Sequence, residues 1–368
     1  MNKIIYLDAA ASALKTQRVI DAEREFLLNS YANPGRGVCS RAAMADNMLA
    51  ESRAYVADFI HADRTHVVFT SGTTDGMNRI VNIICASREI KTVAVSDIDH
   101  HSARMPWEHA ARCRSMKLVK IPLTQNYNID YENLPDADVM VITAMSNVLG
   151  VPNDVGAIVA NARKKNPNVI TIVDAAQYVA HEPINVRDWG CDFLCFSGHK
   201  IGADTGVGVM YIREPDSWSP DKFGGGMVQK ISMDNWVLES SPNKFEAGTL
   251  PLTQIAGLPV AIDGWRTWTG GADIIHYIYD ELSKLPRIRL LTERDAKIVS
   301  FVVRDMHVLD MGTLLGANNV CVRVGNMCAS WIHELMGVAG SIRISVGPWN
   351  TMDDAVMVVN IIRGILEK

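Results

Sequence analysis

Short apolar runs alternate with stretches of helical periodicity through the first two thirds of the chain. The apolar runs are rich in β-branched residues and predict strands at Val67–Thr70, Thr92–Ser96, Lys117–Ile121, Val139–Thr143, Val169–Val173, Phe193–Phe196 and Gly208–Ile212. The stretches between them predict helices at Ala42–Ile60, Gly76–Ser87, Met105–Arg114 and Val155–Lys165. Such alternation is typical of βαβ units in a mostly parallel, doubly wound sheet. Ligands of these sheets bind at the carboxyl ends of the strands.

The pattern changes after the glycine-rich loop Phe223–Met227. From about Gly257 a long helical region is expected. It is followed by a strand at Asn319–Val324, a loop that contains Cys328, a helix at Ala329–Met336, a strand at Ser341–Val346 and a last helix from Met352. We therefore predict a large domain over residues 14–256. Residues 1–13 and 257–368 are expected to form a smaller α/β domain that carries Cys328 and Arg343.

Composition narrows the class of protein. The chain has 368 residues, 48% of them hydrophobic, and its net charge is −5 with no long run of one sign. These values indicate a globular protein and argue against a nucleic-acid binder or a polybasic membrane anchor. No run approaches the roughly 18 apolar residues of a membrane span, and the apolar start of the chain stops at Asp8, unlike a signal peptide. The seven scattered cysteines lack zinc-site spacing, so we expect no metal and a reducing cytoplasm.

A lysine follows one of the buried strands. Ser197-Gly-His-Lys200 comes directly after the apolar run Cys191–Phe196. Burial disfavours the ammonium form of lysine, and a neutral amine is suited to Schiff-base formation with a carbonyl cofactor. A lone lysine at a strand end is nevertheless usually an ordinary solvated residue.

A carboxylate follows another strand. Val169–Val173 ends in Asp174-Ala-Ala-Gln177, and a carboxylate there is able to pair with a protonated pyridine nitrogen. On its own, an aspartate after a strand is more often a helix N-cap. Together with Lys200 it makes a pyridoxal phosphate site the leading hypothesis.

Such a cofactor also needs an anion site for its phosphate. Thr70-Ser-Gly-Thr-Thr-Asp-Gly76 follows a strand and opens a helix, and it offers backbone N–H groups, hydroxyls and the helix dipole. An ordinary Ser/Thr-rich N-cap is an equally open interpretation. The loop lacks both common nucleotide-binding glycine patterns.

Two adjacent histidines follow the strand at Thr92–Ser96, in Asp99-His-His-Ser102. An imidazole there is suited to stack on a pyridine ring and to move protons near neutral pH. A metal site with two histidines is the alternative, but the sequence shows no third ligand at a suitable spacing.

The last third of the chain contributes a thiol and a guanidinium. Cys328 lies in a loop between a strand and a helix, where the helix N-terminus favours a nucleophilic thiolate. An incidental small residue is an equally open interpretation. Arg343, on the next strand, has a guanidinium group that is suited to bind a substrate carboxylate through two N–H groups. It is equally consistent with one half of a structural ion pair.

Taken in order, these segments resemble a known family. The motifs are Tyr6-Leu-Asp-Ala-Ala-Ala-Ser12, SGTTDG, DHHS, MSNVLG, VDAAQ, FSGHK, FEAGT and RVGNMCA. With them the chain resembles, over nearly its whole length, the fold type I pyridoxal-phosphate enzymes of the class V aminotransferase family. More narrowly, it resembles cysteine desulfurases of the SUF type and the related selenocysteine lyases. The resemblance implies an α/β fold with pyridoxal 5'-phosphate as cofactor.

The resemblance also implies a role for each cofactor-binding residue. Lys200 would hold the cofactor as a Schiff base, Asp174 would bind the pyridine nitrogen and Gln177 the phenolic oxygen, while His100 would stack on the ring and help to move protons. Hydroxyl and imidazole groups would hold the phosphate: Thr73, Thr74, Ser197, His199 and, from the other subunit of a homodimer, Thr249.

For the substrate, the resemblance implies that Asn147 and Arg343 fix the carboxylate of L-cysteine, with Arg323 nearby. Cys328 would take the sulfur as a persulfide and alanine would leave. A sulfur-acceptor protein would then collect the sulfur, as in iron–sulfur cluster assembly. A class V enzyme that acts on another amino acid by transamination, epimerisation or β-elimination, or a non-catalytic scaffold, is the alternative.

The chain departs from the family pattern near the substrate. Gly35, Cys39, Asn326 and Met327 stand where relatives often carry histidine. Cys39 is therefore considered as a second sulfur site. The departures bear on substrate and rate rather than on the binding of the cofactor.

Overall fold

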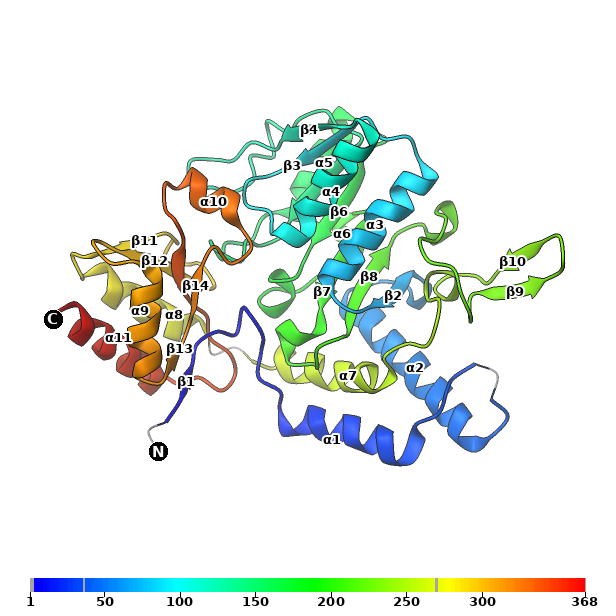
Figure 1. The fold of residues 1–368 in the computed structure, drawn as a ribbon, viewed down its shortest axis with the longest axis horizontal. Helices are drawn as coiled ribbons and strands as arrows, with labels where there is room; N and C mark the ends of the chain where they lie inside the picture. Colours follow the sequence, from blue (N-terminus) through cyan, green and yellow to red (C-terminus); the bar gives the residue numbers. More distant parts are fainter. Residues whose placement is uncertain (1–2, 36, 269–270, 368) are drawn as a thin grey trace.

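A seven-stranded sheet organises most of the chain, which this computed structural model describes over residues 3–35, 37–268 and 271–367 (Figure 1). The strand order is β2-β8-β7-β6-β5-β3-β4, and only β8 runs antiparallel to its neighbours. The strands are β2 (Val67–Thr70), β3 (Thr92–Val95), β4 (Lys117–Lys120), β5 (Val139–Thr143), β6 (Ile170–Asp174), β7 (Phe193–Ser197) and β8 (Gly208–Ile212). All seven predicted strands are present, with ends shifted by at most one residue. The predicted mostly parallel α/β sheet is confirmed.

Helices cover both faces of this sheet, which explains why its strands are continuous apolar runs. In β5, Met140 and Ile142 pack into one buried cluster, whereas Val139 and Val141 pack into another. The helices of this part are α1 (Gln17–Glu25), α2 (Ser40–Phe59), α3 (Thr73–Ser87), α4 (His101–Arg114), α5 (Val155–Lys165), α6 (Val186–Trp189) and α7 (Leu252–Arg266). Among the described residues, none of the helices is both long and apolar enough to cross a membrane.

A second, four-stranded antiparallel sheet lies beside the first (Figure 1). Its order is β11 (Ile288–Leu290), β12 (Val299–Val303), β15 (Ser341–Ile344) and β14 (Arg323–Gly325). Its apolar residues share a cluster with three helices, α8 (Gly271–Ser283), α9 (Val308–Ala317) and α11 (Met352–Leu366), and a short helix α10 (Ser330–Leu335) follows β14.

Two sequence predictions for this region are wrong in detail. The long helical region contains two strands, β11 and β12, between α8 and α9, and the β-branched run Ile298–Val303 accounts for β12. The single strand predicted at Asn319–Val324 is two strands, β13 (Val320–Cys321) and β14, which pair with different neighbours. Periodicity within one segment carries no information about its pairing partners, so this break was not predictable from the pattern.

The N-terminal segment links the two sheets. Strand β1 (Ile5–Tyr6) pairs with β13, Asp8 forms a bridge with Ser345, and Ala13 N–H donates to the carbonyl of His199 at 2.9 Å. Residues 8–13 therefore run from the second sheet to the loop after β7. The domain boundaries at residues 13/14 and 256/257 stay a prediction, and residues 1–2, 269–270 and 368 of the expected small domain lie outside the described residues.

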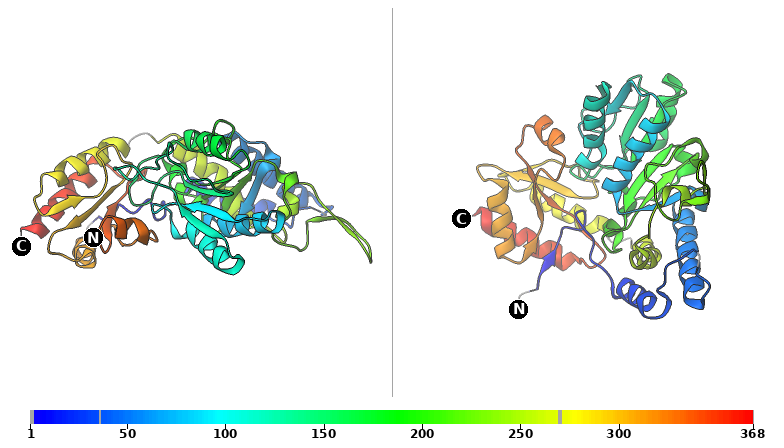
Figure 2. Two further views of the ribbon diagram at one scale, coloured as in Figure 1. Left: turned by 90° about the horizontal axis from the view of Figure 1, so that it is seen from above. Right: turned by 45° about the vertical axis from the view of Figure 1, so that its right-hand side comes forward.

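A β-hairpin extends away from the large sheet (Figures 1 and 2). It consists of β9 (Val228–Ile231) and β10 (Trp236–Leu238), and the glycine-rich loop leads into it. Its apolar side chains face solvent: Ile231 is 73% exposed, Met233 100% and Trp236 53%. Isolated hairpins are marginally stable in water. We therefore expect the exposed apolar side chains of this hairpin to pack against another surface.

A buried ion pair fixes the FEAGT segment that follows the hairpin. Arg53 of α2 donates through both terminal nitrogens to Glu246 at 2.8 Å, and Glu246 also accepts from Phe69 N–H at 2.7 Å. Both side chains of the pair are nearly inaccessible to solvent. Glu246 thereby joins the segment before Thr249 to strand β2 and helix α2.

We expect Arg53→Met to lower the free energy of unfolding by about 3–5 kcal/mol, because Glu246 would stay buried without its cation. Urea unfolding of the purified protein measures the difference. The matched control is Arg18→Met, which removes the exposed pair between Arg18 and Asp263 and should cost less than about 1 kcal/mol. Equal midpoints for the two variants would contradict this account.

Candidate active site

A cavity of about 250 Å³ lies at the carboxyl ends of β5, β6 and β7. The ends of these strands each supply a lining residue: Thr143, Asp174 and Ser197. The other lining residues come from the start of α3, the start of α4 and the loops after the strands: Thr73, Thr74, His100, Ser102, Met145, Asn147, Ala176, Gln177, His199 and Lys200. The topology thus brings together most of the side chains that the sequence singled out, at the edge where α/β sheets bind ligands.

Lys200 lies in the short 3-10 turn Gly198–Ile201 after β7. Burial lowers the pKa of its amine to about 7, and the nearby Arg343 acts in the same direction, while Asp174 and Asp8 oppose the shift. Its Nζ donates to the carbonyl of Ala10 at 2.5 Å, and Gln177 Nε2 donates to the same carbonyl at 2.8 Å. A large fraction of the amine is therefore neutral near pH 7, the form in which an amine attacks a carbonyl.

Asp174 ends strand β6 with its side chain buried. One carboxylate oxygen accepts from Ala176 N–H at 2.9 Å. Burial raises the pKa of this carboxyl to about 6, and the buried Asp99 contributes to the rise. The helical turn that follows Asp174, the 3-10 turn at Tyr178–Ala180, has Gln177 as its N-cap and no side-chain cap, so the N-cap interpretation does not apply. A buried, cavity-lining carboxylate is suited to pair with a protonated heterocyclic nitrogen.

His100 is the N-cap of α4. Its Nδ1 accepts from Ser102 N–H at 3.1 Å and lies 2.7 Å from the Ser102 hydroxyl. Burial, together with the nearby charge of Lys200, lowers the pKa of the imidazole to about 4. With Nδ1 accepting a backbone proton, the neutral ring carries its own proton on Nε2.

The loop between β2 and α3 provides a cluster of donors. Thr73 N–H donates to Ser197 Oγ at 2.8 Å, and the Thr73 and Ser197 hydroxyls also lie 2.8 Å apart. Gly72, the N-cap, contributes no side-chain cap and has φ of 144°, a conformation that favours glycine. The first turn of α3, with Thr73 and Thr74, therefore presents hydroxyls and N–H groups to the cavity that His199 also lines, as an anion site requires.

Arg343 takes part in an ion-pair network. This buried side chain donates to Asp8 Oδ1 at 3.2 Å and to the Asn147 carbonyl at 2.9 Å, and Arg323 pairs with the other oxygen of Asp8 at 2.6 Å. Two polar atoms in the described structure remain without a hydrogen-bond partner here, Arg343 Nε and Asn147 Oδ1. Asn147 lines the cavity, whereas Arg343 does not line it and contacts the backbone carbonyl of Asn147. The free acceptor therefore belongs to a lining residue and the free donor to a residue hydrogen-bonded to it.

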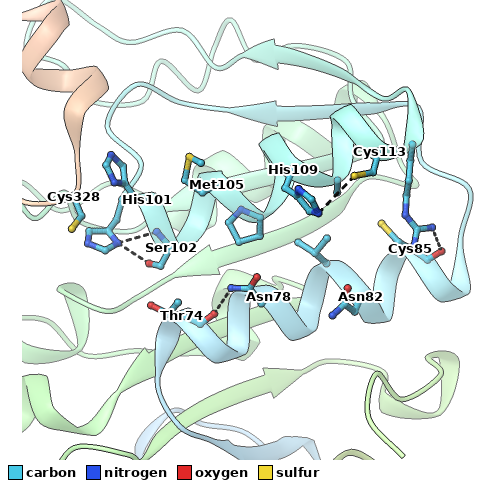
Figure 3. A pocket seen from close by; sticks show the side chains of 15 residues that line it. Thr74, Asn78, Asn82, Cys85, His101, Ser102, Met105, His109, Cys113 and Cys328 are labelled. Atoms are coloured by element: carbon cyan, nitrogen blue, oxygen red, sulfur yellow. Dashed lines mark hydrogen bonds between the residues drawn. The ribbon is translucent and has the colours of Figure 1, made fainter.

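Cys328 lines a second cavity that adjoins the first. A groove of about 680 Å³ between α3 and α4 is lined by Cys328 together with Thr74, His100 and Ser102, three residues that also line the first cavity (Figure 3). The thiol is exposed, in the loop between β14 and α10. The structure therefore brings the cysteine of the C-terminal region to the edge of the site formed by the large sheet.

Other sequence-derived residues do not line this cavity. Thr249 is exposed after the FEAGT segment, Arg323 pairs with Asp8, and Cys39 is exposed at the start of α2. The structure adds Ala10, whose carbonyl accepts from Lys200, and Asp8, which links two arginines. The Tyr6–Ser12 motif marked that segment, but only the folded chain shows what it contacts.

Comparison with known proteins decides the family. The aminotransferase class-V family model matches residues 5–358. The chain belongs to the class V aminotransferase family. It is 32% identical over 370 residues to a probable cysteine desulfurase of Vibrio cholerae, covering 96% of this chain and 91% of the relative. A cysteine desulfurase of Pectobacterium atrosepticum is 31% identical, with coverage of 95% and 90%.

Solved structures of cysteine desulfurases resemble this fold over nearly the whole chain. The apo cysteine desulfurase of Thermococcus onnurineus superimposes with a TM-score of 0.94 at 29% identity, covering all of this chain and 95% of that one. A cysteine desulfurase of Escherichia coli gives 0.91 at 30% identity, with coverage of 99% and 95%. The fold type I resemblance inferred from the motifs is confirmed.

The geometry at His100 predicts that its imidazole stays neutral throughout the range from pH 8 to pH 5. A pKa lowered to about 4 means that the ring gains its second proton only as the pH falls through that value. In ¹⁵N-histidine NMR spectra, Nδ1 should appear unprotonated and Nε2 protonated, with the signal assigned by its loss in His100→Gln. A protonation midpoint at the ordinary value near 6.5 would show that the ring is not buried as described.

Proposed function

We propose that this class V protein is a pyridoxal-phosphate-dependent cysteine desulfurase that transfers the sulfur of L-cysteine to Cys328 and releases L-alanine. The observation that carries the proposal is the position of Cys328, in a groove that shares Thr74, His100 and Ser102 with the cavity lined by Lys200 and Asp174. A transaminase or an epimerase has no use for a thiol there. The relatives named cysteine desulfurase support the same assignment.

The lining residues fit pyridoxal phosphate, on which the class V aminotransferases and cysteine desulfurases depend. Lys200 offers an amine with a lowered pKa, Asp174 a buried carboxylate for the ring nitrogen, and Gln177 an amide for the phenolic oxygen. Thr73, Thr74, Ser197 and His199 surround the N-terminus of α3, where phosphate binds favourably. When bound, the cofactor supplies an electron sink for the electron pair left as the α-proton of an amino acid departs.

Lys200 is placed to hold that proton. Its Nζ is buried, and because its pKa is lowered to about 7 it changes protonation state near neutral pH. A general base works best with a pKa close to the working pH. His100 presents a neutral ring whose Nε2–H is available for proton transfer, because Nδ1 is occupied by Ser102.

The free atoms at Arg343 and Asn147 fit an amino-acid substrate. Arg343 Nε is a buried donor without a partner, as a carboxylate would need. Asn147 Oδ1 is an acceptor without a partner beside it, while its Nδ2 donates to the Met327 carbonyl at 2.7 Å. Asp8 neutralises part of the charge of Arg343 and Arg323, so one substrate carboxylate suffices to balance the pair.

The transfer itself conserves atoms and electrons. The bond between Cβ and sulfur of L-cysteine breaks, a bond between that sulfur and Cys328 Sγ forms, and the thiol proton replaces sulfur in the alanine product. The sulfur is oxidised to the persulfide level while Cβ is reduced, so no external oxidant is needed. Because Cys328 is exposed, the persulfide faces solvent and an acceptor protein or thiol is able to collect it.

The setting of the enzyme is part of the proposal. All seven cysteines are free thiols, which a reducing cytoplasm maintains. A supply of sulfur to iron–sulfur cluster assembly follows from the resemblance to SUF-type enzymes.

The enzyme is proposed to act as a homodimer with shared sites. Thr249 is exposed and lies outside the cavity of its own chain, and the nearby hairpin exposes Ile231, Met233 and Trp236. A second copy of the chain would cover these apolar side chains and receive Thr249 at its phosphate site. Exposed apolar groups clustered on a protruding element are typical of interaction surfaces.

The proposal predicts that Cys328→Ser binds L-cysteine, seen as a change in the cofactor absorbance, yet forms no alanine. The serine hydroxyl cannot accept sulfur. Mass spectrometry of the wild-type protein after brief L-cysteine treatment should place the extra sulfur on the peptide containing Cys328.

Cys113→Ser is the matched control, because this exposed thiol lies in the same groove beside His109. It should retain wild-type activity. Full alanine formation by Cys328→Ser, or sulfur found only on Cys39, would leave an alternative class V reaction as the better assignment.

Subunit mixing tests the shared site. Thr249→Ala should weaken retention of the cofactor by about ten- to a hundredfold, the range for one hydrogen bond to a charged acceptor. In a heterodimer of Thr249→Ala and Lys200→Ala chains, one site contains an intact lysine and an intact threonine, so tight cofactor binding and activity should return.

Lys200→Ala mixed with Asp174→Ala is the control, because both residues line the cavity of one chain and no intact site results. Recovery in both mixtures, or an active monomer by light scattering, would contradict the shared site.

A further inference from the structure

The loop that carries Cys328 has an unfavourable backbone conformation. Met327 and Cys328 both have positive φ, 49° and 54°, the left-handed region that residues with a side chain rarely adopt. Two such residues in succession persist only where surrounding contacts hold them. The loop therefore needs anchors outside itself.

Polar anchors attach the loop to the large sheet's side of the molecule. His101 N–H, in the first turn of α4, donates to the Cys328 carbonyl at 2.7 Å. Asn147 Nδ2 donates to the Met327 carbonyl at 2.7 Å, and Ser330 N–H donates to His101 Nε2 at 3.4 Å. These bonds fix the loop's backbone, but each involves polar groups with which water competes.

Trp331 adds an apolar anchor at the start of α10. Its ring lies 4.0 Å from the guanidinium carbon of Arg104 and 5.1 Å from the His101 ring, with the two rings edge to face. Such cation–π and edge-to-face contacts are favourable and directional.

Arg104 is itself held rigidly. It is 7% exposed and donates to the Ser96 carbonyl at 3.1 Å, to Asp97 at 3.0 Å and to Glu108 at 3.1 Å. Its guanidinium plane therefore serves as a preorganised surface for the Trp331 ring. Helix α10 has only six residues, so its position depends on what its side chains contact.

We propose that Trp331 is a positioning residue for sulfur transfer: by packing on Arg104 and His101 it keeps the Cys328 loop docked beside His100. The inference rests on the proposed desulfurase function and deepens it. Without the ring, the two strained residues relax and the loop leaves α4, which moves the thiol away from the cavity. Binding of the L-cysteine carboxylate at Arg343, whose hydrogen bonds go to Asp8 and to the Asn147 carbonyl, does not involve Trp331 and continues.

Trp331→Ala tests the proposal in the holoenzyme. Hydrogen–deuterium exchange at the His101 amide, which donates to Cys328, should become about tenfold faster, as expected for loss of a partly buried cation–π contact. In a single turnover, persulfide should appear on Cys328 about tenfold more slowly. The L-cysteine concentration that gives half of the cofactor absorbance change should not move.

Two further variants separate positioning from general loosening of the helix. Trp331→Phe keeps a ring on Arg104 and should restore both rates to near wild type. Leu335→Ala removes an exposed side chain from the same helix and should change neither. Wild-type exchange and persulfide rates in Trp331→Ala would overturn the proposal, as would equal slowing in Leu335→Ala.

The outcomes also separate this inference from the function on which it rests. If the wild-type protein binds L-cysteine but acquires no persulfide, the desulfurase assignment fails, and Trp331 has no sulfur transfer to position. If persulfide forms normally and only the Trp331 contrast is absent, the desulfurase assignment stands and the positioning role is wrong.

Discussion

The site depends on the removal of the Lys200 amine from water. Burial at the end of a strand disfavours the charged ammonium form, and this lowers the pKa of the Lys200 amine to about 7. The protein supplies limited compensation: the carbonyl of Ala10 accepts from Nζ, and the carboxylates of Asp174 and Asp8 lie close enough to act on the charge. A fully paired lysine would stay protonated and unreactive, so this partial compensation is what makes the amine useful.

The same constraint explains why the N-terminal segment is part of the site. Residues 8–13 run from the second sheet to the loop after β7, and their carbonyl and carboxylate groups face cations from both parts of the chain. Asp8 joins Arg343 of β15 to Arg323 of β14, while Ala10 joins Lys200 to Gln177. The residues proposed to bind substrate and cofactor and the contact between the two sheets thus depend on one short stretch of backbone.

The sequence predicts well which residues at the strand ends come together in one cavity. Asp174, Lys200 and His100 each follow an apolar strand, and parallel strands bring their carboxyl ends to one edge, so their meeting follows from topology. The roles of Ala10 and Asp8 were not predictable, because a backbone carbonyl has no sequence signal and an acid after a short strand has many uses. The Trp331–Arg104 contact was not predictable either, because it joins segments that lie far apart in the sequence. The division of Asn319–Val324 between two sheets was missed because it depends on which strands pair with each half. The expected phosphate contact of Thr249 stays a prediction, because this residue lies outside the cavity of its own chain.

The most direct test of this account is the pH dependence of cofactor attachment to Lys200. Protein freed of cofactor is mixed with pyridoxal phosphate at a series of pH values and reduced with borohydride, and the rate of labelling of the Lys200 peptide is measured. Because only the neutral amine attacks the carbonyl, the rate should rise with pH and level off above a midpoint near 7. A rate that keeps rising towards the ordinary lysine value near 10.4, or labelling confined to another lysine, would contradict the central claim.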